Sequence, residues 1–342
     1  MDVHPAALDA APARAAPMAH GADARRTALL LGQPSLREYL DFVGEEVIGG
    51  ETADQRALCD EWRAANDYYG ELERTEAGLA DGAGCHDLDP AFAPFAERVM
   101  DDPAIRRSFD TLPTRVALVE LDRLVVYQTR VDQDFVEALQ ARLGPEPDAQ
   151  APDAQAPDAQ APDAQALVRF CLPLPGRDRD APPLRVRKIG PRRYSFTSAS
   201  SDVRFHDAVL LDPARLGEHD GGGPVGGALG LLVGFGSNML NVVRSDGDGR
   251  MLLINGYHRA CALRALGVTH APCLVQTVTR RDELALTAPS RVIDTPAFYF
   301  KSARPPLLKD FFDPRIRKVV PVRRVEHVIE LSFEVREYDV EA

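Results

Sequence analysis

The segment formed by residues 250–268, RMLLINGYHRACALRALGV, constrains the fold most, because its structural breaks can be placed from residue chemistry alone. It opens with four apolar residues, 251–254, a run short enough for a buried strand. Asn255 and Gly256 then end the run, since both residue types tolerate a positive φ and favour a tight turn. The segment therefore predicts a strand that stops abruptly at residue 255.

Residues 257–266 consist mostly of good helix formers, and Gly267 stands where a left-handed residue commonly ends a helix. Residues 273–278, CLVQTV, form a short, mainly apolar run that is typical of another strand. Strand, tight turn, helix and strand therefore follow one another. His258 and Arg259 lie in the first turn of the predicted helix.

This position favours an anion. A helix start presents unpaired backbone N–H groups and about half a positive charge. Arg259 adds donors matched to phosphate oxygens, and His258 adds a donor or a proton-transfer group. Gly256 permits close approach of a ligand to the backbone. The alternative is a surface helix whose Arg is solvated and whose His caps the turn.

The sequence Asn255-Gly256-Tyr257-His258-Arg259, placed between a strand and a helix that ends in Leu-Gly-Val, resembles the ParB/sulfiredoxin superfamily. Its members carry G-E-R-R, G-C-H-R or G-H-H-R at this turn and bind nucleotide phosphates there. The resemblance covers residues 204–278 and includes residues 116–139. It implies a nucleotide of the ATP or CTP class with Mg²⁺ bridging its phosphates. The nucleotide-binding residues that it implies are Asn255, Gly256, Tyr257, His258, Arg259, Ser237 and Asn238.

The chain also departs from the family. Sulfiredoxins have a cysteine where this chain has Tyr257, which argues against cysteine sulfinate repair. The free-serine kinases of the superfamily have Asp where this chain has Asn255. No helix-turn-helix follows the nucleotide motif, which counts against a chromosome-partitioning protein. Nucleotide binding is therefore the property that the resemblance transfers best.

Residues 115–127, RVALVELDRLVVY, are rich in β-branched side chains and predict one or two strands around a turn at Asp122. A kinase-type relative needs a carboxylate near the nucleotide to take a hydroxyl proton. Glu120 is the candidate for this catalytic role, together with His258. The plainer interpretation, that Glu120 and Asp122 are solvent-facing strand residues, is the favoured one.

The composition of the chain limits the kinds of partner that it can bind. The net charge of −12 argues against broad binding of nucleic acid, so DNA is a less favoured partner than a nucleotide. Five cysteines without a C-x-x-C pair indicate reduced thiols, and we expect a cytoplasmic protein. No apolar run approaches the ~20 residues that would span a membrane.

The predicted fold class is α+β, with a ParB/sulfiredoxin-like mixed-sheet core and a helical N-terminal extension. The expected units are a disordered tail (1–25), the helical extension (26–112), the core (113–279) and a C-terminal extension with a closing strand (280–342). Within the core, four copies of PDAQA occupy residues 147–166. We expect residues 145–166 to form a disordered insertion, because such polar repeats cannot bury a core.

Three further patterns predict elements that bear on the site. Residues 167–174 predict a strand, and residues 228–233 predict the helix that the superfamily places before the motif. Helical periodicity from residue 35 predicts the N-terminal helices, whose surface is a candidate contact for a protein partner. In the C-terminal part, aromatic residues interleaved with basic ones favour packing on the core over stacking on nucleic acid.

Three hypotheses on function follow. In the first, which is favoured, the core hydrolyses the nucleotide or transfers its terminal phosphoryl group to a small molecule. In the second, the nucleotide is a conformational ligand that controls a protein or DNA partner without turnover. In the third, the core is degenerate, binds nothing and serves as a scaffold.

Overall fold

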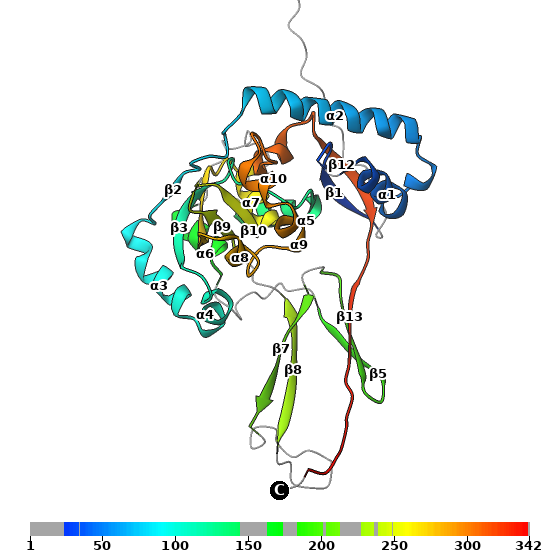
Figure 1. Ribbon diagram of the computed structural model, residues 1–342, viewed down its shortest axis with the longest axis vertical. Helices are drawn as coiled ribbons and strands as arrows, with labels where there is room; N and C mark the ends of the chain where they lie inside the picture. Colours follow the sequence, from blue (N-terminus) through cyan, green and yellow to red (C-terminus); the bar gives the residue numbers. More distant parts are fainter. Residues whose placement is uncertain are drawn as a thin grey trace, which may run out of the picture.

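The computed structural model describes residues 24–33, 35–143, 163–173, 183–200, 203–212, 227–235, 239–247 and 249–340. This part of the chain forms several separate sheets and many short helices, so the protein is a mixed α+β protein, as predicted. Figure 1 shows a main body, with the long helix α2 (Gln55–Thr75) across one end and strands that project from the other end.

The largest sheet has the strand order β10-β9-β11-β3-β2. Its members are β2 (Cys85–His86), β3 (Thr114–Glu120), β9 (Asn241–Ser245), β10 (Met251–Asn255) and β11 (His270–Val278). β11 runs parallel to β9, and the other neighbouring strands are antiparallel, which makes the sheet mixed. Seven residues of β11 are buried, because both faces of the sheet are covered.

Helices from different parts of the chain cover the two faces of this sheet. One face packs against α5 (Gln133–Leu143), α6 (Ala164–Cys171) and α7 (Tyr257–Ala265). The short helices α3 (Ala93–Asp101) and α4 (Pro103–Phe109) add Val99 and Phe109 to the same core. The other face packs against α8 (Arg281–Leu284), α9 (Ser290–Asp294) and α10 (Pro296–Lys301).

A second sheet joins the two ends of the described chain. Its order is β12-β1-β4, from β1 (Ala24–Leu30), β4 (Arg130–Asp132) and β12 (Arg317–Arg323), all antiparallel. The prediction of a tail up to residue 25 is therefore wrong at its last two residues. The N-terminal part is also not wholly helical, because β1 forms a strand whose partner lies almost 300 residues away in the sequence.

The N-terminal helices themselves are confirmed. α1 (Leu36–Glu46) begins with a capping box, in which Ser35 and Glu38 satisfy each other's backbone N–H groups. α2 begins with Asp54 as its N-cap. Both helices pack on β1 and β12 through a core that contains Tyr39, Tyr69 and Val320. The aromatic residues of this region thus serve packing.

The strand predicted for residues 167–174 is wrong, because these residues largely belong to helix α6. The side chain of Asp163 accepts a hydrogen bond from the N–H of Ala166 at 3.3 Å and caps the helix. Asp163 and Ala166 belong to the last PDAQA copy, so the predicted insertion ends four residues early and its last copy starts a helix. Short apolar runs such as this one fit a helix and a strand equally well. The remaining residues of the insertion, 145–162, lie outside the described residues.

The helix predicted for residues 228–233 is also wrong. They lie in β8 (Ala228–Phe235), which pairs antiparallel with β7 (Val203–Leu211). Gly230 and Gly234 weaken any helix here, and pairing with β7 satisfies the backbone instead. The predicted closing strand corresponds to β13 (His327–Ser332), which pairs with β6 rather than with the core.

Strands β5 (Arg185–Gly190) and β6 (Arg193–Ser198) complete a three-stranded sheet with β13. β5 presents a solvated face, since five of its six residues are exposed. Among the C-terminal aromatic residues, Tyr299, Phe300 and Phe311 are buried, in agreement with the predicted packing on the core.

A buried ion network fixes the C-terminal segment to α2. The Arg304 side chain has no exposed surface, and its guanidinium donates to both carboxylate oxygens of Asp310 at 3.0 and 2.6 Å. Its Nε donates to Glu76, at the end of α2, at 3.0 Å. The N–H of Leu307 and the hydroxyl of Tyr69 also donate to Asp310. Burial raises the pKa of Tyr69 well above its usual range, so its hydroxyl stays protonated.

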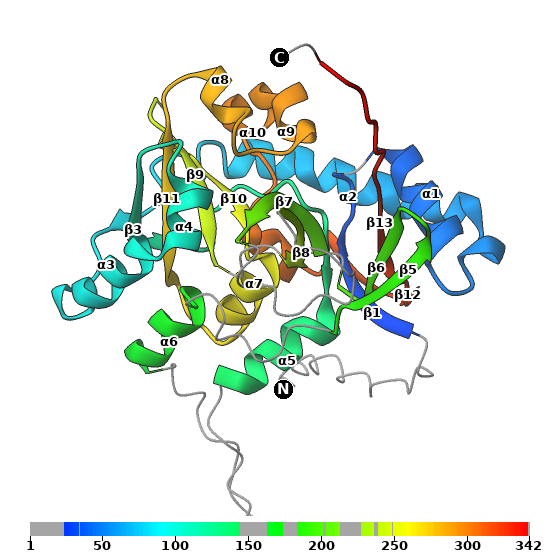
Figure 2. The same ribbon diagram turned by 90° about the horizontal axis from the view of Figure 1, so that it is seen from below.

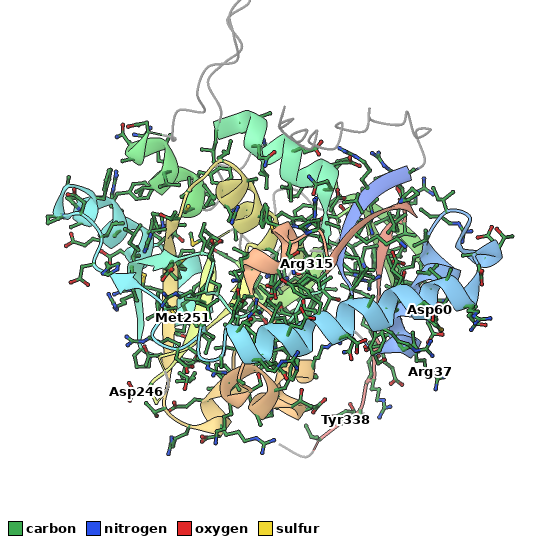
Figure 3. The ribbon with its side chains drawn as sticks, turned by 90° about the horizontal axis from the view of Figure 1, so that it is seen from above. Arg37, Asp60, Asp246, Met251, Arg315 and Tyr338 are labelled. Carbon is green, nitrogen blue, oxygen red and sulfur yellow. The ribbon has the colours of Figure 1, made fainter. Side chains whose placement is uncertain are left out.

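We expect Asp310→Ala to destabilise the protein by about 3–5 kcal/mol, because it leaves the Arg304 charge buried without its main partner. Urea unfolding followed by circular dichroism measures this change. The matched control is Arg37→Ala, since the pair of Arg37 with Asp41 is exposed and Arg37 points away from the body in Figure 3. The control should cost less than about 1 kcal/mol. Equal losses in the two variants would contradict a structural role for the buried network.

Candidate functional site

The predicted strand, turn and helix are present at residues 251–265. Gly256 has φ +90°, and a Cβ there would lie 2.7 Å from Leu240 Cδ2 and 3.2 Å from the carbonyl oxygen of Met239. Glycine is therefore required both for the backbone conformation and for the contact with residues 239–240. Asn255 Oδ1 accepts a hydrogen bond from the N–H of Gly256 at 2.8 Å, which holds the turn from its strand side.

The end of the helix also follows the prediction. Gly267 has φ +80°, its N–H donates to Arg264, and the N–H of Val268 donates to Leu263 at 3.0 Å. This is the hydrogen-bond pattern of a left-handed helix cap. Cys261 is buried on the inner face of the helix, and burial raises the pKa of its thiol to about 12.

The side chain of Tyr257 serves the fold, so the assignment of this residue to a nucleotide would rest on its backbone at the start of α7. Its side chain is buried, and its hydroxyl accepts from the N–H groups of Tyr127 and Gln128 at 3.0 and 3.3 Å. The same hydroxyl donates to the carbonyl of Leu253 at 2.8 Å. Burial holds the pKa of this phenol far above its usual range. Tyr257 thus ties residues 127–128 to the motif strand.

His258 reaches the start of helix α5. Its Nε2 accepts a hydrogen bond from the N–H of Asp132 at 3.0 Å, and its ring meets the Phe135 ring edge-on with centroids 5.2 Å apart. A ring nitrogen that accepts a hydrogen bond carries no proton, so the proton of the neutral ring is assigned to Nδ1. While this bond exists, Nε2 is not available to take a proton from a substrate. His258 is held as a positioning residue between β4, α5 and α7.

Arg259 faces helix α6. Its guanidinium carbon lies 5.0 Å from the centroid of the Phe170 ring, a cation–π contact. Burial raises the pKa of the neighbouring Cys171 thiol, although the charge of Arg259 opposes this rise. Sequence patterns gave no sign of this contact, because residues 167–174 were assigned to a strand. The helix that starts in the last PDAQA copy therefore covers the motif arginine.

Glu120 lies at the other end of α7, so its proposed role as the catalytic base for the motif turn is wrong. Leu121, the next residue, donates its N–H to Thr269, which follows the helix. The carboxylate of Glu120 accepts from the N–H of Gly84 at 3.1 Å and pairs with Arg123 at 3.2 Å. The eight-residue separation of the two helix ends, at 1.5 Å rise per residue, puts Glu120 roughly 12 Å along the axis from His258.

Glu120 instead belongs to a polar group around Gly84. A Cβ on Gly84 would lie 3.3 Å from Glu120 Oε2, His86 Nε2 and His270 Nε2 alike. His270 pairs directly with Glu120 across β11 and β3, which explains the arrangement. Among the described residues, however, no three His, Cys, Asp or Glu side chains are grouped closely enough to hold a metal ion.

Ser237 and Asn238, assigned to the nucleotide by resemblance, lie outside the described residues. Asn241, at the start of β9, is buried and pairs with Asn255 across the strands. Its Nδ2 donates to Gln276 Oε1 at 3.3 Å, and its Oδ1 has no hydrogen-bond partner among the described atoms.

The chain matches no protein-family model, no curated protein and no solved structure. Within the described ranges, none of the helices combines the length and the apolar character needed to cross a membrane.

We expect Gly256→Ala to be more destabilising than Gly267→Ala. Both positions have a positive φ, which costs an alanine about 1–2 kcal/mol. Only Gly256 also has an atom closer than 3.0 Å to the new Cβ, Leu240 Cδ2 of the buried Leu240, which adds an overpacking cost of about 1–3 kcal/mol, whereas Gly267 has nothing within 4 Å. Chemical unfolding of the two variants compares these costs. Equal destabilisation would contradict the close contact of Gly256 with residues 239–240.

Proposed function

We propose that the chain binds a nucleotide through its phosphates at the first turn of α7, within a ParB/sulfiredoxin-like core, and that the bound nucleotide acts as a conformational signal. The sequence resemblance supports the nucleotide. The left-handed Gly256, followed by a nine-residue helix with Arg259 in its first turn, supports the phosphate position. Mg²⁺ would bind together with the nucleotide, as the cation that its phosphates carry.

The observation that carries the proposal is that three separate segments meet at this one turn. Residues 239–240 lie against Gly256, the start of α5 donates to His258, and α6 covers Arg259 through Phe170. A ligand at the turn must therefore change contacts with elements that are distant in the sequence. A ligand shifts a conformational equilibrium only through such differential contacts.

Arg259 is the residue through which phosphate would act on α6. A hydrogen bond to a charged group contributes about 1.5–3 kcal/mol, so two would outweigh a cation–π contact, which contributes about 0.5–1 kcal/mol at exposed sites and about 2 kcal/mol when desolvated. A phosphate that offers two acceptors would thus draw the guanidinium away from the Phe170 ring. Helix α6 would lose one of its contacts with α7 and could reposition.

A signal is favoured over turnover because the proposed acid–base groups are in the wrong places. Glu120 lies by the far end of α7, and His258 Nε2 is occupied by the N–H of Asp132. The carboxylate of Asp132 accepts from the N–H of Phe135 and lies 4.0 Å from Arg25, so it is engaged as a cap for α5. Phosphoryl transfer needs a group that positions or deprotonates the nucleophile.

We expect one of ATP, ADP, CTP and GTP, each with Mg²⁺, to bind the wild-type protein in isothermal titration. Arg259→Ala should weaken this binding at least roughly tenfold, because two charge-assisted contacts are lost. Arg264→Ala is the matched control. Arg264 belongs to the same helix and its guanidinium lies 4.6 Å from the Phe312 ring, but it occupies the last turn and pairs with Asp122.

The control should bind as the wild type does. If no nucleotide binds, or if both arginine variants lose binding equally, the phosphate site at the start of α7 is rejected.

Two measurements on the complex then distinguish a conformational signal from enzymatic turnover of the nucleotide. Hydrogen exchange should change in residues 163–171 and 133–143 when nucleotide binds, and these changes should be absent in Arg259→Ala. Phosphate release should stay at the uncatalysed rate, with and without candidate small-molecule acceptors. Sustained release that depends on Arg259 would replace the signalling hypothesis with the phosphotransferase or nucleotide hydrolase hypothesis.

A further inference from the structure

Strands β5 and β6 form a hairpin that projects from the main body. Figure 1 shows the hairpin extending away from the central sheet, and Figure 2 shows it from its outer end, beside β13. A tight turn, Pro191 and Arg192, connects the two strands. β6 lies between β5 and β13, so β5 is an edge strand of its sheet. The outer end of the hairpin is therefore accessible to a partner.

The hairpin concentrates positive charge in a chain whose net charge is −12. Residues 184–198 contain four arginines and one lysine and no acidic residue. All five basic residues are exposed; they are Arg185, Arg187, Lys188, Arg192 and Arg193. A short segment of one sign on a chain of the opposite sign indicates a local function for that charge.

Two of the five charges are neutralised by β13 and the residue before it. Arg185 pairs with Glu326, and Arg193 pairs with Glu330 at 2.7 Å. Within the part of the chain that the structure describes, the other three side chains form no ion pair. They belong to residues 187–192, which include the turn, so the uncompensated charge lies toward the outer end of the hairpin.

The acidic body does not cancel this charge. The six residues of β5, at about 3.3 Å per residue, span roughly 20 Å. The Debye length is about 10 Å at about 0.1 M salt, so carboxylates at the base of the hairpin are largely screened from its end. The net charge describes the whole chain, whereas the potential at the end of the hairpin is set by the charges close to it.

The three unpaired charges point in different directions. Arg187 and Lys188 are neighbours in one strand, so their side chains lie on opposite faces of the hairpin. Arg192 belongs to the turn and continues the charge around the end. A flat acidic surface contacts only one of these faces. A groove with an anionic wall on each side contacts both.

Duplex DNA has such a groove. The major groove of B-form DNA is about 12 Å wide and admits a two-stranded ribbon, and a row of phosphates borders each side. The guanidinium groups of Arg187 and Arg192 match phosphate oxygens in geometry, and Lys188 adds a point charge. The major groove of A-form RNA is deep and narrow and excludes such a ribbon.

Single-stranded nucleic acid fits the hairpin less well. Sites for single strands stack the bases on exposed aromatic rings. The aromatic residues of the hairpin, Tyr194 and Phe196, are half-buried, and the Tyr194 ring stacks on Phe333 with centroids 6.5 Å apart. The hairpin thus presents charge without a stacking surface.

We propose that the β5–β6 hairpin inserts into the major groove of duplex DNA and binds its phosphates through Arg187, Lys188 and Arg192. Phosphate contacts carry the sequence-independent part of binding, so the interaction depends strongly on salt and weakly on base sequence. This interaction goes beyond the nucleotide site at α7 and does not require it, because the hairpin belongs to a separate sheet.

The test is fluorescence anisotropy of a labelled, mixed-sequence DNA duplex of about two helical turns, titrated with the full chain in the absence of nucleotide. Three phosphate contacts predict a slope of about −2.7 for the logarithm of the association constant against the logarithm of the salt concentration. The affinity should therefore fall roughly 40-fold between about 50 and 200 mM salt. An RNA duplex and a single strand of the same sequence should bind more weakly than the DNA duplex.

The triple variant Arg187→Gln/Lys188→Gln/Arg192→Gln should weaken binding at least roughly tenfold at about 50 mM salt and bring the slope close to zero. Lys188→Gln alone should reduce the steepness of the slope by about 0.9. The three side chains are exposed, so the circular dichroism and the unfolding midpoint of these variants should match those of the wild type.

The matched control is Arg56→Gln/Arg74→Gln/Lys301→Gln. It also removes two exposed guanidinium groups and one exposed ammonium group, but from α2 and α10 in place of the hairpin. The net charge of the two triple variants is the same, so a general effect of charge would weaken binding in both. The control should keep the affinity and the salt slope of the wild type.

Four outcomes would overturn the proposal. The first is a wild type that does not bind the DNA duplex at about 50 mM salt. The second is an equal loss of binding in the hairpin variant and the control. The third is binding of the RNA duplex or the single strand as tight as that of the DNA duplex. The fourth is equally tight binding of poly-glutamate, which would indicate an acidic protein as the partner.

Discussion

The fold depends on how residues 124–126 are placed between the motif strand and the C-terminal segment. The N–H of Val125 donates to Met251 and its carbonyl accepts from Leu253, both at 2.9 Å, so this short stretch extends the sheet beyond β10. On its other side, the N–H of Leu308 donates to Leu124 and the N–H of Val126 donates to Pro306, again at 2.9 Å. Residues 306–308 in turn are fixed by the buried pair of Arg304 and Asp310. Three parts of the sequence are thus joined at one edge of the sheet, and β10 is an interior strand.

This arrangement explains why the side chains of Tyr257 and His258 at the motif turn form hydrogen bonds within the protein. The chain continues from residue 126 into Tyr127 and Gln128, whose N–H groups donate to the Tyr257 hydroxyl, and then into β4 and Asp132, whose N–H donates to His258. The side chains of Tyr257 and His258 at the motif turn therefore hold one continuous segment, residues 124–132, against α7. In such a site, binding and conformation are difficult to separate, because a ligand at the helix start competes with contacts that fix the fold.

The local part of the site could be predicted from the sequence, and the long-range part could not. The strand, the glycine turn and the capped helix depend on neighbouring residues, and residues 251–267 accordingly have the predicted structure. The position of Glu120 depends on the register of β3 against β11, which brings it to His270 and away from His258. The pairing of β1 with β12 depends on residues at opposite ends of the chain. For residues 164–171 and 228–235, short apolar runs did not distinguish a helix from a strand, and the outcome was decided by an Asp cap in one case and by a neighbouring strand in the other.

The PDAQA repeats and the strands β7 and β8 both precede the motif in the sequence, and both are followed by residues that contact the motif turn. The last PDAQA copy provides Asp163, the cap of the helix that covers Arg259, so a change in this copy would alter a contact of the candidate site. Strands β7 and β8 replace the helix expected before the motif, and the next described residues after β8, Met239 and Leu240, lie against Gly256. The contact that makes a glycine necessary at residue 256 therefore comes from the segment just before β9, which local sequence patterns did not place against the turn.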